Sequence, residues 1–117
     1  MIKDAAYIEA FDSNEFILED MMRKGVDLSV AREIEFAHKF TNVSSAESFL
    51  LGMTDLGHGA KLSILEPNNI DVIVTSNLIP EVNAITGLEV SFDKLARQHG
   101  GYADGWGFWD DDRITKQ

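Results

Sequence analysis

Apolar and polar residues alternate most regularly between residues 30 and 40. Ile34 and Phe36 share one parity with further apolar residues, whereas Glu33 and Glu35 fall on the other parity. Because successive side chains of a strand point to opposite faces, residues 30–40 are predicted to form a strand with one buried and one wetted face. Such a strand is typical of an antiparallel sheet that is covered on one side only.

Helical spacing of apolar residues predicts three helices, over residues 13–24, 44–56 and 86–99. Ser13 is an N-cap residue type and is taken as the start of the first helix. Two capping-box patterns, Ser44-Ser45-Ala46-Glu47 and Thr86-Gly87-Leu88-Glu89, are taken as the starts of the other two. Residues 60–65 and 71–75 read as a strand hairpin around a turn at 66–69, and the very apolar 71–75 is expected to be central.

The last patterned stretch, residues 100–112, places glycine or alanine at alternate positions. As a regular strand it would carry Tyr102, Asp104, Trp106 and Phe108 on one face, with Trp109 on the other. One interpretation is a core strand whose glycines allow close backbone approach. The other is an exposed aromatic surface, beside the acidic run 110–112, that receives a partner.

The resulting order is an extra N-terminal helix followed by β-α-β-β-α-β, the ferredoxin-like α+β unit. We therefore expect a single domain over residues 1–117, with a core at about 13–112 and a short, loose polar tail at 113–117. Strand 30–40 is expected to pair with the final strand.

The net negative charge argues against binding to nucleic acid or to anionic membranes. Asp and Glu number 20 against 10 Lys and Arg, which gives a net charge of −10. Such a field repels nucleic acid and anionic membranes and attracts basic partners, although acidity also serves solubility. There is no Cys and no apolar run long enough to span a bilayer, which suits a cytoplasmic protein.

Candidate chemistry is sparse. Asp104 together with Asp110, Asp111 and Asp112 could hold Mg²⁺ for phosphoryl chemistry, but the sequence has no phosphate-binding loop. No nucleophile, base and acid occur at a diagnostic spacing, so no catalytic residue, metal or cofactor is predicted. A small-molecule sensor built on a ferredoxin-like sheet is a further alternative, and nothing in the sequence names its ligand.

The run Gly100-Gly101-x-x-Asp104-Gly105-Trp106-Gly107, after a helix ending in Leu95-Ala96-Arg97-Gln98-His99, resembles the C-terminal motif of the regulator of ribonuclease E activity B family. The helix around Phe16–Met22 and the strand with Ile34-Glu35-Phe36 are similar in placement. The resemblance covers roughly residues 13–112. It implies a cytoplasmic, ferredoxin-like protein that binds and inhibits ribonuclease E, or a similar basic RNA-processing enzyme, without cutting RNA.

These considerations predict a binding surface on the last strand and the wetted strand face. Trp106 or Trp109 is expected to be the aromatic anchor, and Asp104, Asp110, Asp111, Asp112, Glu33 and Glu35 are expected to be the charge partners. The alternatives are the Mg²⁺-dependent enzyme and the small-molecule sensor. The sequence leaves the oligomeric state open.

Overall fold

The computed structural model describes residues 5–110 and 113–116. Three helices and five strands follow one another as α1 (Ala5–Arg23), β1 (Arg32–Phe40), α2 (Val43–Asp55), β2 (Gly59–Glu66), β3 (Asn69–Leu78), α3 (Val82–Gln98), β4 (Tyr102–Asp110) and β5 (Arg113–Lys116). The strands form one sheet in the order β2-β3-β1-β4-β5, with every neighbouring pair antiparallel. The first four strands have the ferredoxin-like arrangement that the sequence predicts. As expected, β3 is an interior strand and β1 pairs with β4.

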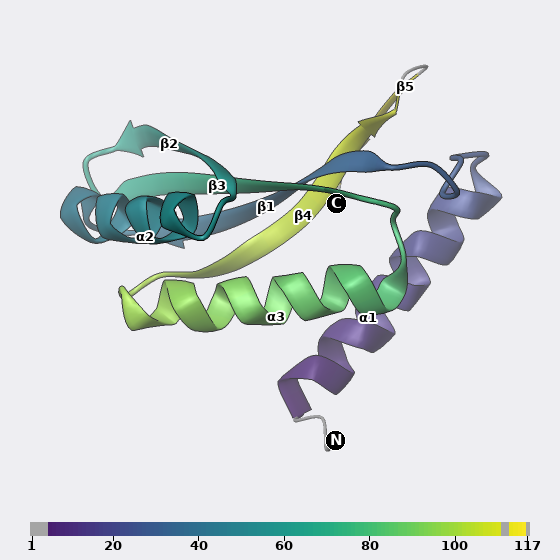
Figure 1. Cartoon of the computed structure of the whole chain (residues 1–117), viewed down its shortest axis with the longest axis horizontal. Coiled ribbons are helices and arrows are strands. Elements are labelled where there is room, and N and C mark those ends of the chain that lie inside the picture. The colour runs from purple at the N-terminus through teal and green to yellow at the C-terminus, as the bar shows by residue number, and fades with distance from the viewer. Residues whose placement is uncertain (1–4, 111–112, 117) are drawn as a thin grey trace.

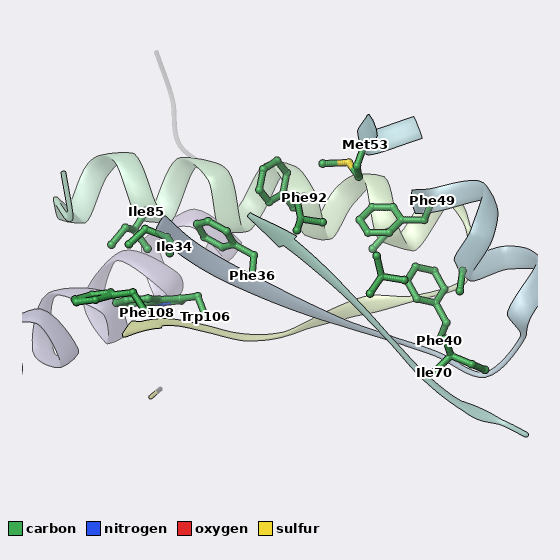
Figure 2. Close-up of a cluster of buried hydrophobic side chains, with 14 of the residues drawn as sticks. Ile34, Phe36, Phe40, Phe49, Met53, Ile70, Ile85, Phe92, Trp106 and Phe108 are labelled. Carbon is green, nitrogen blue, oxygen red and sulfur yellow. The ribbon is translucent and has the colours of Figure 1, made fainter. Parts of the chain in front are cut away.

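Helices α2 and α3 cover one face of the sheet (Figure 1). The apolar parity of β1 points toward them, and the aromatic rings of Phe36 and Phe92 meet edge to face at 5.2 Å. Phe40 lies 5.3 Å from Phe49 between ring centres. Figure 2 shows Phe40 and Phe49 toward one end of the core cluster, with Phe36 nearer to Trp106 and Phe108 at the other end. Within residues 5–110 and 113–116, no helix covers the opposite face of the sheet.

Helix α1 begins at Ala5, so the predicted start at Ser13 is wrong. Within the extra turns, the ring of Tyr7 stacks on Phe11 with centroids 6.4 Å apart. The Tyr7 hydroxyl also donates to Asn83 Oδ1 on α3, a tertiary contact that local pattern does not reveal. Because α1 packs against α3, it extends the helical layer and leaves the other sheet face open.

Both predicted capping boxes are also misplaced. Asn42 is the N-cap of α2 and accepts a hydrogen bond from the Ser45 backbone N–H, so Ser44 lies inside the helix. Glu81 is the N-cap of α3, directly after Pro80, and its carboxylate accepts from Asn83 N–H. Thr86 is therefore a fully buried residue in the second turn of α3 rather than a cap.

Strand β4 contains a bulge, and this overturns the predicted single face for Tyr102, Asp104, Trp106 and Phe108. Tyr102 pairs with Lys39, whereas Trp106 pairs with Phe36, so the register shifts between the two pairs. Gly105 has a φ of 114°, a conformation that suits glycine. Cross-strand partners share a face, so Tyr102 lies on the open face and Trp106 on the helix-covered face.

The chain after β4 also differs from expectation. A loose polar tail was expected at 113–117, but Arg113–Lys116 form β5, antiparallel to β4. Its register pairs Gly107 with Lys116 and Trp109 with Ile114. β5 therefore pairs with residues 107–110 of β4, whereas the pairing with β1 runs from Tyr102 to Gly107.

Candidate protein-binding surface and groove at the last long strand

The two tryptophans of β4 have opposite surroundings. Trp106 is only 3% exposed and belongs to the core, whereas Trp109 is 50% exposed. The sequence leaves open which of the two is exposed. In the structure it is Trp109. The alternation of side chains along the strand places it on the open face of the sheet.

Carboxylates accompany Trp109 on the open face. Glu35 pairs with Gly107 across the strands, so Trp109 and Glu33 lie two residues further along the same face. Glu33 is exposed and Glu35 half-buried. The predicted side-chain contacts of Asp110, Asp111 and Asp112 lie outside the described residues.

Asp104 lies exposed at the bulge, toward the other end of this face. Nearby, Lys39 Nζ lies 2.6 Å from Asp71 Oδ1 and 3.1 Å from Asn69 Oδ1. The hydrogen bond that Lys39 donates to Asp71 raises the pKa of Lys39, and the negative charges of Asp71 and Asp104 add to this effect. The one lysine on β1 is thus engaged by β3, while Asp104 remains at the surface.

On the helix-covered side of the bulge, α1, α3 and β4 enclose a groove of about 860 Å³. Its floor is largely apolar and is lined by Ala6, Ala10, Ile17, Val90, Ala103, Gly105 and Trp106. Its rim carries four carboxylates and two cations, from Glu9, Asp12, Glu89, Asp93, Lys94 and Arg97. No local sequence pattern predicts this groove, because it depends on how α1 packs against α3.

Asn14, a buried residue of α1, holds the three elements of the groove together. Its Nδ2 donates to Thr86 Oγ1 over 3.1 Å and to Glu89 Oε1 over 3.0 Å. Its Oδ1 accepts a 2.8 Å hydrogen bond from the indole Nε1–H of Trp106. The only sequence signal for this network was a polar residue among the apolar positions of the first helix.

This packing determines the surroundings of two carboxylates of α3, Glu89 and Asp93. Burial raises the pKa of Glu89, the hydrogen bond from Asn14 opposes the shift, and the negative charge of Asp93 adds to it. Asp93 accepts a 2.8 Å bond from the backbone N–H of Ala103 and another from Arg97 Nε. One oxygen of Asp93 thus ties α3 to the bulged half of β4.

Metal binding has little support in the described residues. No group of three or more His, Asp or Glu side chains among them is placed to hold an ion. His38, on the buried parity of β1, lies 3.3 Å from the Val72 carbonyl oxygen through Nδ1 and packs its ring on Phe49. Burial lowers the pKa of His38. Within the described residues, no helix is long and apolar enough to cross a bilayer.

Residues 11–108 match the family model described as regulator of ribonuclease activity B. The chain belongs to this family. The resemblance seen in the sequence is thereby confirmed, and it implies a ribonuclease as the protein partner. No curated protein matches the chain.

The regulator of ribonuclease activity B match includes most of α1, all of α3 and the bulge of β4. The Asn14–Trp106 bond and most of the groove-lining residues therefore lie inside the matched segment. Trp109 and Asp110 lie just beyond its end.

Proposed function

We propose that this protein is a non-catalytic regulator that binds and inhibits ribonuclease E in the cytoplasm. Membership of the regulator of ribonuclease activity B family carries the proposal. The net charge of −10 supports a protein partner rather than RNA, because an acidic domain repels the phosphate backbone. Enzyme segments that grip RNA are rich in Arg and Lys, and a carboxylate surface can occupy them.

The open sheet face supplies the surface for this contact. Trp109 is the aromatic anchor, since a half-exposed indole can bury a large area on a partner at little conformational cost. Glu33 and Glu35 place negative charge on the same face, and Asp104 adds charge at the bulged end of that face. Asp110, Asp111 and Asp112 add three more carboxylates in the sequence directly after Trp109. Trp106 contributes indirectly, by fixing β4 against α1.

Binding kinetics on surface-captured ribonuclease E test the proposal. Trp109→Ala should speed dissociation by about tenfold or more, because interface changes act mainly on the dissociation rate. Leu51→Ala is the matched control: Leu51 is 61% exposed, on α2 and away from the open face. Absence of any binding by the folded wild-type chain would refute ribonuclease E as the partner.

A further inference from the structure

We propose that the groove between α1, α3 and the bulge of β4 binds an arginine-bearing, amphipathic segment of the same protein partner. This inference rests on the proposed function, but it concerns the opposite side of β4 from Trp109. The partner would then contact both faces of the last long strand.

Small residues create the space. Ala6 and Ala10 line the groove from α1, and Ala103 and Gly105 line it from β4. The bulge turns the Trp106 indole beneath the groove, where Asn14 holds it. The floor is therefore apolar and fixed in place, as expected for a site that receives apolar side chains with little reorganisation.

Charge at the rim determines the occupant. Four carboxylates face two cations, and the guanidinium of Arg97 is already held 2.8 Å from Asp93 Oδ2. Glu9 and Asp12 are exposed on the α1 rim, opposite Glu89 on α3. A cationic ligand with an apolar stem fits such a site, whereas phosphate groups would be repelled.

Glu89 favours arginine in particular. Its Oε1 accepts a hydrogen bond from Asn14. Among the described residues, no hydrogen-bond donor is seen for its other oxygen, Oε2. Burial opposes its negative charge, so an incoming cation would relieve that cost. A guanidinium donates in a planar fork and keeps its charge when partly buried, which an ammonium group does less well.

Two variants test the groove. Ala103→Phe fills it from the floor, and its control is Ser48→Phe on the exposed surface of α2. The double variant Glu9→Gln, Asp12→Asn removes rim charge from exposed positions, so the fold should survive even if Ala103→Phe does not fold. Its control is Glu15→Gln, Glu19→Gln, which makes the same charge change on exposed residues of α1 outside the groove.

The probes are captured ribonuclease E and short overlapping peptides that together cover its sequence. Both groove variants should weaken binding by about tenfold, and the controls by less than about threefold. The basic peptide that binds most tightly should shift the indole N–H resonance of Trp106 more than that of Trp109. Replacing the arginines of this peptide by lysine should weaken its binding. Equal binding of the lysine peptide would contradict the arginine assignment.

The outcomes separate the two proposals. If ribonuclease E binds normally to the folded rim variant and loses affinity only for Trp109→Ala, the groove inference is wrong and the proposed function stands. If wild-type chain binds neither ribonuclease E nor any of its peptides, both are wrong. Loss of binding in the groove variants, with the controls intact, supports both.

Discussion

Trp106 and Asn14, which are 92 residues apart in the chain, share a buried 2.8 Å hydrogen bond between the indole Nε1–H and the amide Oδ1. This bond joins the last long strand to the first helix, and Asn14 passes the connection on to Thr86 and Glu89 of α3. This amide therefore helps to fix the position of α1, and with it the shape of the groove, together with the packing of α1 on α3.

Truncation of the two tryptophans should therefore have different effects on stability. Trp106→Ala should lower the free energy of unfolding by about 3–5 kcal/mol, because it opens a core cavity and removes the hydrogen-bond donor of the buried Asn14 Oδ1. Trp109→Ala should change it by no more than about 0.5–1 kcal/mol, since half of its surface is already exposed. Urea unfolding curves of both variants measure the difference, and equal losses would contradict the assignment of core and surface.

The bulge of β4 should tolerate substitution of Gly105 poorly. Gly105→Ala should destabilise the protein by about 1–3 kcal/mol, because a φ of 114° is strained for any residue with a Cβ. Gly52→Ala is the matched control within α2, where an added Cβ meets no atom within 4 Å. That change should stabilise the protein by about 0.5–1 kcal/mol. Thermal melts compare the two, and a neutral Gly105→Ala would mean that the bulge is not required.

Acid should destabilise the protein through His38. Its pKa in the folded state lies below the ordinary 6.5, so unfolded chains take up the proton first as the pH falls below 6.5. The free energy of unfolding should fall between pH 6.5 and the lower folded-state pKa. His38→Leu should remove this part of the pH dependence, and an unchanged pH profile would contradict it.

Glu89 should contribute to the pH dependence of stability in the opposite direction to His38. Its folded-state pKa lies above 4.5, so the native state binds a proton before the unfolded chain does and gains stability as the pH falls through that value. Glu89→Gln should therefore make the acid destabilisation steeper than in the wild type. Urea midpoints measured across a pH series test this, and a shallower profile in Glu89→Gln would contradict the burial of that carboxylate.

Partner binding should depend on salt. Replacing Asp110, Asp111 and Asp112 by Asn should slow association and flatten its salt dependence, because exposed charges are screened beyond about 8 Å at physiological ionic strength. Glu33→Gln with Asp104→Asn should act in the same direction. Association rates on captured ribonuclease E at several salt concentrations measure this, and salt-independent association would contradict electrostatic steering.

Local pattern was sufficient for much of the fold. The alternation around Ile34 and Phe36 placed β1 and its buried face correctly, and the order of elements gave the sheet topology. It failed where one residue changes the pattern. Gly105 takes a positive φ and reverses the parity of β4, so Tyr102 and Trp106 lie on different faces despite their even spacing.

The site was less predictable because its contacts are distant in sequence. Thr86 and Glu89 look like the two ends of a capping box, yet both are bonded to Asn14 inside the fold. Asn14 itself carried the signal, as a polar residue on an apolar helix face, but its partner Trp106 is at the other end of the chain. The groove follows from that pairing and not from any motif.

Cleavage of a defined RNA by purified ribonuclease E, with increasing amounts of this protein, tests whether the protein inhibits the enzyme. We expect that cleavage slows in a saturable way, that Trp109→Ala shifts the curve to higher concentration, and that the protein alone leaves the RNA intact with or without Mg²⁺. Unchanged cleavage at saturating wild-type protein, or Mg²⁺-dependent RNA cleavage that follows the protein through purification, would contradict it.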